Sequence, residues 1–272
     1  MRPGVGYLEI CEGVENEIRR RGGDPAFPSG LGVNEVTAHF APEQEERRFI
    51  TGDDLVKLDY GVHIEGYIAD TSLTVTYNAA YQPLLKATER ALQAAIEVVK
   101  RDRRVGEIGR AIAREASKDG FKTISNLSGH TVERYVVHAG KSIPNMFMPN
   151  LPVLRQDEVF AIEPFLTFGD ASGYVVDSEP ETIFSIIARK RTGSKELDEL
   201  LEMIWSRRKS LPFTPRWFAK EYEMTKMVRY LKELKARRLV RAYPTLVEHS
   251  RRPVAQFEHT VALEEDGAVI LT

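Results

Sequence analysis

Five ionisable residues lie inside segments that otherwise have the composition of β-strands. They are Asp59 in VKLDYGV, Asp70 in GYIADTSLTV, His130 in LSGHTVERYVVH, Glu163 in VFAIEPF and Glu258 in AQFEHTVAL. Burying a charge in such a segment costs too much free energy unless the charge is paired or binds a metal. Four carboxylates balance the charge of two divalent cations, and oxygen-rich ligation with one histidine suits Mn, Fe, Co or Zn. The pattern therefore predicts a site for two divalent metal ions between strands.

The first two of these residues fall on the two arms of a predicted β-hairpin. Residues 55–64 and 67–77 are rich in β-branched and aromatic residues, and Glu65-Gly66 between them is typical of a two-residue turn. With that turn, Asp59 and Asp70 project from the same face as diagonal neighbours, roughly 6–8 Å apart at their Cβ atoms. Two carboxylates so placed repel each other, and a cation between them removes the repulsion.

The overall composition favours a globular enzyme. The 272 residues are 42% hydrophobic, which is enough for one large domain or for a domain with an insertion. No run of about 18 apolar residues occurs, and the N-terminus lacks a basic and then apolar signal peptide. The single cysteine, Cys11, cannot form an internal disulfide. We expect a soluble, cytoplasmic protein that does not act at a membrane.

The character of the sequence changes between residues 189 and 248. Two charged helical stretches, KELDELLEMIWSRR and YEMTKMVRYLKELKARR, flank LPFTP, and RRLVRAYPTL then has an extended pattern. Residues 189–241 hold 16 Lys and Arg against 7 Asp and Glu, a local charge of +9 in a chain of net charge −2. The sequence thus predicts an acidic catalytic domain over 1–188 and 249–272, with a basic, helical, winged-helix-like insertion over 189–248.

Periodicity predicts the remaining elements. Helices are expected where apolar residues recur at helical spacing, and strands where β-branched and aromatic residues cluster. His130 and His138 are eight positions apart, so they point the same way if the residues between them are extended. The expected helices cover 6–22, 83–100 and 105–119, and the expected strands cover 132–137, 158–162, 165–168, 174–176, 181–187 and 254–263.

Taken in order, the motifs resemble a known family. AFPSGLGVNEVTAHF, KLDYGVHIEGYIADTSLTV, NLSGHTVERYVVHAGKSIPN, FAIEPF and AQFEHTV are similar to those of the methionine aminopeptidases. The insertion of roughly 60 residues before the last motif resembles the type 2 branch of that family, which is archaeal or eukaryotic. The resemblance implies the pita-bread fold, an α+β arrangement of curved antiparallel sheet with pseudo-twofold symmetry and outer helices. Relatives usually carry a further helix before the equivalent of RPGVGYLEI. Either such a helix is encoded upstream or it is absent from this protein, and we expect that adding an upstream helix would raise the melting temperature.

The resemblance also implies roles for single residues. Asp59 would chelate one metal, Asp70 and Glu258 would bridge both, and His130 and Glu163 would complete the second. Three further expectations concern catalysis and substrate: Glu163, His39 and His138 act on the substrate, Phe27 lines the pocket for a methionine side chain, and Tyr243 closes that pocket. The implied reaction removes the N-terminal methionine of nascent proteins that have a small second residue. A monomer is also expected. Its basic insertion either contacts ribosomal RNA near the emerging nascent chain or only narrows the entrance of the active site.

Three alternatives stay open at this point. A peptidase acting on Xaa-Pro bonds, such as prolidase or aminopeptidase P, uses the same fold and ligands, although such relatives usually have an additional N-terminal domain. A non-catalytic protein of the same fold would bind proteins or RNA, but the presence of all five ligand residues favours an enzyme. The buried carboxylates could also be neutralised by arginines, yet few arginines lie near these motifs.

Overall fold

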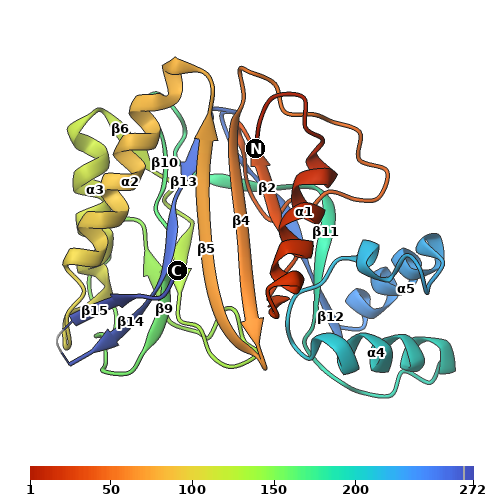
Figure 1. Ribbon diagram of the computed structural model, residues 1–272. Helices are drawn as coiled ribbons and strands as arrows, with labels where there is room; N and C mark the ends of the chain where they lie inside the picture. Colours follow the sequence, from red (N-terminus) through yellow and green to blue (C-terminus); the bar gives the residue numbers. More distant parts are fainter. Residues whose placement is uncertain (266) are drawn as a thin grey trace.

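The computed structural model describes residues 1–265 and 267–272 and has a central antiparallel sheet flanked by helices (Figure 1). The helices are α1 (Tyr7–Arg20), α2 (Gln82–Glu97), α3 (Val105–Lys118), α4 (Lys195–Arg208) and α5 (Met224–Ala236), with 3-10 helices at Ala79–Tyr81 and Pro215–Phe218. The strands are β1 (Asp24–Pro25), β2 (Gly30–Val33), β3 (Val36–Ala38), β4 (Leu55–Ile64), β5 (Tyr67–Thr76), β6 (Phe121–Thr123), β7 (Ser128–His130), β8 (Ser142–Pro144), β9 (Val159–Ile162), β10 (Phe165–Phe168), β11 (Val175–Ile186), β12 (Val240–Glu248), β13 (Val254–Gln256), β14 (Glu258–Glu264) and β15 (Gly267–Ile270).

The β4–β5 hairpin forms the middle of the largest sheet, and its predicted register is confirmed. β1 and β2 pair with β4, while β14 pairs with β5, β9 and β15. Asp59 lies opposite Ser72, and Asp70 lies opposite Gly61. The turn residues Glu65 and Gly66 have φ angles of 52° and 89°, the left-handed conformation that a two-residue hairpin turn requires. The alternation along both strands therefore places the two aspartates on one face.

Helices cover this sheet on both sides of the hairpin (Figure 1). α2 and α3 close over a core that includes Leu84, Ile108 and Phe160. α1 packs its apolar face, including the fully buried Cys11, against Leu31 of β2 and neighbouring residues. The predicted helices over 6–22, 83–100 and 105–119 are thus confirmed to within a few residues. No helix among residues 1–265 and 267–272 is long and apolar enough to cross a membrane.

The insertion has a core of its own next to the sheet edge. Leu200, Ile204 and Leu231 of α4 and α5 pack together with Phe213, which lies between these helices. The segment predicted as an extended wing is strand β12, which pairs with β11 and β3 outside the insertion. Val240 at the start of β12 belongs to the core of the insertion, whereas Leu246 near its end packs on a different cluster. The limits of a subdomain over 189–248 therefore stay a prediction.

Two strand predictions were wrong in detail. Residues 132–137 form a loop with one isolated bridge between Glu133 and Val136, instead of a strand. The segments predicted separately at 174–176 and 181–187 belong to one strand, β11, whose register shifts near Glu181. The run of β-branched residues in the first case reflects burial of Val132 and Val137 rather than pairing in a sheet.

Candidate metal centre

The sheet register brings the four acidic residues to one place. Asp59 of β4 and Glu258 of β14 lie on either side of Ser72 in β5, because both residues pair with that serine. Asp70 is two positions from Ser72 and so projects from the same face. His259 lies opposite Ile162. Glu258, the first residue of β14, therefore lies next to Glu163, the residue that follows β9. The four carboxylates thus converge from four strands.

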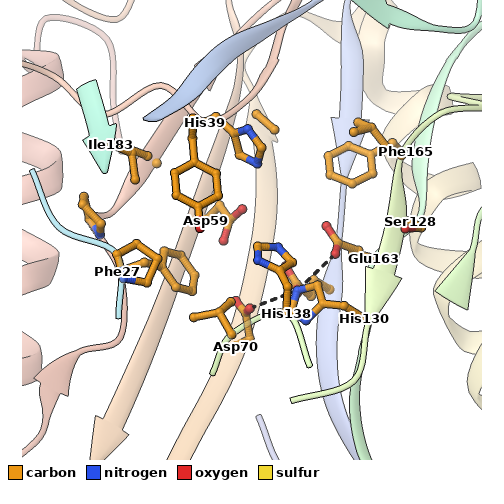
Figure 2. Close-up of a pocket in the computed structure, with 18 of the residues that line it drawn as sticks. Phe27, His39, Asp59, Asp70, Ser128, His130, His138, Glu163, Phe165 and Ile183 are labelled. Carbon is orange, nitrogen blue, oxygen red and sulfur yellow. Dashed lines mark ion pairs between the residues drawn. The ribbon is translucent and has the colours of Figure 1, made fainter. Parts of the chain in front are cut away.

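His130 completes this group from the end of β7. Its Nε2 atom lies 3.7 Å from Asp70 Oδ2 and 3.5 Å from Glu163 Oε1. Ligand atoms of Asp70, His130 and Glu258 all lie within 4.8 Å of one another. Figure 2 shows Asp59, Asp70, His130 and Glu163 directed toward a common cavity, which Glu258 also lines. The structure therefore brings together all five residues that the sequence singled out.

Burial makes this group of charges unfavourable without a cation. It raises the pKa of Asp59 to about 7. Burial, followed by repulsion from neighbouring carboxylates, raises the pKa of Asp70, Glu163 and Glu258 well above their ordinary values. Burial and the adjacent His138 lower the pKa of His130 to about 3, which keeps the imidazole neutral and able to act as a ligand. A divalent cation among these groups would reverse the penalty on the carboxylates.

The donor set fits divalent metals. Asp59 Oδ1 and Asp70 Oδ1 are buried and have no hydrogen-bond partner among the described residues. No lysine or arginine of the described chain lines the cavity or forms an ion pair with the four carboxylates. Buried carboxylates need partners, so the reading in which arginines neutralise them is wrong. Oxygen donors with one imidazole match Mn, Fe, Co or Zn.

A cavity of about 250 Å³ adjoins the carboxylates. Its volume is below the range of about 300–1,000 Å³ typical of pockets for drug-sized ligands, which fits a single amino-acid side chain. Phe27 and Tyr243 both line it, as do Ile183 and Phe165. Tyr243 pairs with Ile183 across β12 and β11, so this part of the wall comes from the two strands that precede α4 and follow α5. In Figure 2, Phe27 and Ile183 lie on the side of the cavity away from Glu163.

Two further histidines line the same cavity. The His138 ring lies 4.3 Å from the His130 ring and 6.4 Å from the Tyr243 ring, between ring centroids, and the His39 ring lies 5.5 Å from that of Tyr243. A loop, and not an extended strand, brings His138 to His130. His39 has a φ of 62°, and burial lowers its pKa to about 4, so its ring is neutral.

Some lining residues escaped the sequence analysis. Phe165 and Ser128 lie two positions from Glu163 and His130 within or next to short strands, so strand alternation gave a usable indication of their direction. Asn126, Ile183 and Pro212 have no such indication, because tertiary folding alone brings them to the site. All five line the cavity.

Comparison with known proteins identifies the family. Residues 1–265 match the model of metallopeptidase family M24. The chain is 40% identical over 272 residues to a methionine aminopeptidase of Pyrococcus horikoshii, a match that covers 100% of this chain and 92% of that protein. The chain belongs to metallopeptidase family M24. Its predicted class, a metal-dependent hydrolase, is confirmed at the level of this family.

Solved structures show the same fold for this M24 chain. A thermophilic Arx1 superposes with a TM-score of 0.82 at 15% identity, covering 98% of this chain and 83% of that one. A methionine aminopeptidase from Thermotoga maritima superposes with a TM-score of 0.69 at 23% identity, covering 99% and 86%. The predicted pita-bread fold is therefore confirmed.

Proposed function

We propose that this M24 metallopeptidase removes the N-terminal methionine from proteins and peptides. The observation that carries the proposal is the small, apolar-walled cavity directly beside four buried carboxylates and His130. The relative from Pyrococcus horikoshii, similar over nearly the whole length of both chains, supports the same activity. A cavity of this size next to the carboxylates would admit one side chain and one terminal amine, which would restrict cleavage to the first residue.

The five converging residues are the proposed metal ligands. Asp59 would be a ligand of one metal ion, Asp70 and Glu258 would serve both ions, and His130 and Glu163 would complete the ligand set of the second. The chemistry supplied by such a bound pair is Lewis-acid polarisation of the substrate carbonyl and a lowered pKa of water.

The residues of the chain itself perform the remaining tasks. Glu163 Oε1 lies 3.5 Å from His130 Nε2. Glu163 is the proposed general base, which takes a proton from the attacking water and passes it to the leaving amine. His138 and His39 carry neutral rings at neutral pH, because burial lowers the pKa of both. Each neutral imidazole has one N–H to donate. His138 donates toward the developing oxyanion, and His39 donates toward the scissile amide.

The pocket wall sets the preference for the first side chain. Phe27 and Tyr243 present aromatic surface to it, and an unbranched thioether packs well against aromatic rings. A small second residue would be preferred if the walls of this cavity, which include His39 and His138, crowd its position. The same fold also suits an Xaa-Pro peptidase, so the assay must separate the two activities.

A peptide-cleavage assay tests the proposal. Metal-free protein is loaded with Co, Mn, Fe or Zn in turn and given Met-Ala, Met-Leu, Ala-Ala and Xaa-Pro peptides. We expect rapid release of methionine from Met-Ala and slower release from Met-Leu. Asp70→Asn or Glu258→Gln should lose bound metal and turnover together. Preference for Xaa-Pro peptides, or full activity after exhaustive chelation, would contradict the proposal.

We further propose that the protein acts in the cytoplasm, as a monomer, on nascent chains at the ribosome. The support is the local charge of +9 over residues 189–241. Arg207, Lys209, Arg237 and Arg238 are exposed, as contact with RNA phosphates requires. Arg208, in the same basic run, is only 7% exposed and therefore does not belong to this surface.

A further inference from the structure

One wall of the cavity is a short segment with few backbone hydrogen bonds to the sheet. Residues 25–29 run from the last residue of β1 to the start of β2 and include Phe27 and Pro28, both of which line the cavity. Toward β4 the segment has a backbone hydrogen bond from Ala26 N to Gly61 O of 2.8 Å. Pro25 and Pro28 have no N–H to donate. The position of Phe27 therefore depends on other contacts at the two ends of the segment.

Arg208, in the last turn of α4, holds the first end. Its buried Nη2 donates to the carbonyl oxygens of Pro25 at 2.8 Å and Ala26 at 3.0 Å. The same nitrogen donates to Pro212 O at 3.0 Å, and Pro212 also lines the cavity. One guanidinium thus ties the Phe27 wall to a second wall contributed by the insertion.

Glu15 of α1 holds the other end. Its Oε1 accepts a hydrogen bond from the backbone N–H of Ser29 at 3.2 Å. Arg216 of the insertion forms a two-point ion pair with this carboxylate at 2.6 and 2.9 Å, and Trp217 Nε1 donates to it at 2.7 Å. Glu15 is 1% exposed and Arg216 is 8% exposed. Such paired, fully desolvated charges hold a fixed geometry, because moving either group leaves a buried charge without its partner.

These contacts do more than attach the insertion to the catalytic domain, because they lie next to the residues that form the cavity wall. Arg208 and Glu15 bond to backbone atoms of Pro25, Ala26 and Ser29, on either side of Phe27 and Pro28. Arg216 also donates through Nε to Pro42 O at 2.9 Å, three residues beyond His39. The insertion therefore reaches both segments that carry Phe27 and His39.

We propose that Arg208 and the Glu15–Arg216 pair are positioning residues that set the selectivity of the pocket for the first side chain of the substrate. The inference rests on the proposed methionine-releasing function. A hydrophobic pocket separates side chains that differ by one methylene only modestly, so a small displacement of its wall changes the ranking of substrates. The insertion thereby acts as a determinant of specificity through atoms that do not touch the substrate.

Arg208→Met tests the inference, since it replaces the aliphatic stem of the arginine with an unbranched apolar chain and removes the guanidinium donors. We expect KM for Met-Ala to rise with kcat largely retained. We also expect the ratio of kcat/KM for Met-Ala over Leu-Ala to fall by roughly tenfold, with bound metal unchanged. Arg208→Lys, which keeps a donor and the charge, should recover part of that ratio. The matched control is Arg189→Met, because Arg189 lies in the same insertion and pairs with exposed Glu202 at 2.7 Å; its ratio should equal that of the wild type.

The outcomes separate a structural role from a positioning role. A lower melting temperature with an unchanged ratio in Arg208→Met would overturn the inference. Should that variant fail to fold, Glu15→Gln decides, because it conserves volume and weakens the hold on Ser29; an unchanged ratio there also overturns it. A wild-type protein that leaves Met-Ala intact with every metal refutes the proposed function itself, whereas wild-type activity with unshifted variants refutes only the positioning role.

Discussion

At the scale of single residues, His39 has the most unusual backbone conformation of the residues that line the cavity. Its φ of 62° lies in the left-handed region, which costs a non-glycine residue of order 1–3 kcal/mol and persists only where the surroundings enforce it. Its Nδ1 is buried without a hydrogen-bond partner among the described residues, and its ring faces Tyr243. The strained backbone and the unpaired nitrogen are both typical of a residue that forms a hydrogen bond with a bound substrate.

Replacement of His39 tests that interpretation. Asparagine tolerates the left-handed conformation better than most residues, so His39→Asn removes the imidazole with little change in backbone strain. We expect the turnover number for Met-Ala to fall by roughly 10²–10⁴, the range for a lost acid–base or positioning group. Metal content, measured by mass analysis of the native protein, should stay at the wild-type level. A parallel loss of metal would show that His39 is a ligand.

The sequence predicted site residues whose charge is unusual for their surroundings, and it missed a residue whose neighbours in the sequence have the same charge. A carboxylate within an apolar run is improbable unless it has a task, so Asp59, Asp70, Glu163 and Glu258 could be found without a structure. Arg208 could not be told from its neighbours in the RRK run. Neighbouring side chains of a helix point in different directions, and the sequence alone does not show which of them is buried. Only the packing of α4 on residues 25–26 separates it from the exposed Arg207.

At the scale of elements, the β4–β5 hairpin was predictable and the loop that carries His138 was not. The turn Glu65-Gly66 fixes register by its own backbone preferences, so the pairing follows from local sequence. Residues 132–137 have a similar composition, but they bury Val132 and Val137 in a loop. Composition reports burial, whereas strand pairing depends on partners distant in the chain.

Gly61 of β4 offers a test of how this strand shapes the pocket. A Cβ atom at Gly61 would lie 2.4 Å from Cε1 of Phe27 and 3.0 Å from Cβ of Ala26. Gly61→Ala should push the Phe27 ring into the cavity, which lowers kcat/KM for Met-Ala by roughly 10- to 100-fold and disfavours methionine relative to alanine at the first position. Gly13→Ala in α1, where a Cβ meets nothing within 4 Å, is the control and should leave kinetics unchanged. A wild-type preference for methionine in Gly61→Ala would show that Phe27 does not form the pocket wall.

At the scale of the whole molecule, charge is distributed unevenly. Ion pairs neutralise part of the basic insertion, since Arg207 pairs with Glu221 and Arg237 pairs with Glu233. Residues 189–241 nevertheless keep a local charge of +9, while the remainder of the chain is acidic. α4 and α5 stand out from the sheet at one side of the molecule (Figure 1). This arrangement separates the basic side of the molecule from the cavity lined by the four carboxylates.

Charge reversal of the exposed part of that face tests the proposed contact with the ribosome. In the variant, Arg207, Lys209, Arg237 and Arg238 are each changed to Glu, and Arg208 is left intact because it is buried under the pocket wall. Binding through phosphates releases about 0.7–0.9 counterions per contact. The loss of four contacts should therefore reduce the slope of log K against log salt concentration by roughly three. We expect co-sedimentation with ribosomes at low salt to fall sharply while cleavage of Met-Ala persists. A control of equal charge change on the catalytic body, with the exposed Lys86, Arg101, Arg114 and Lys118 changed to Glu, should still co-sediment. Co-sedimentation that is unchanged in the insertion variant, or lost equally in the control, would leave the insertion with a role at the active site alone.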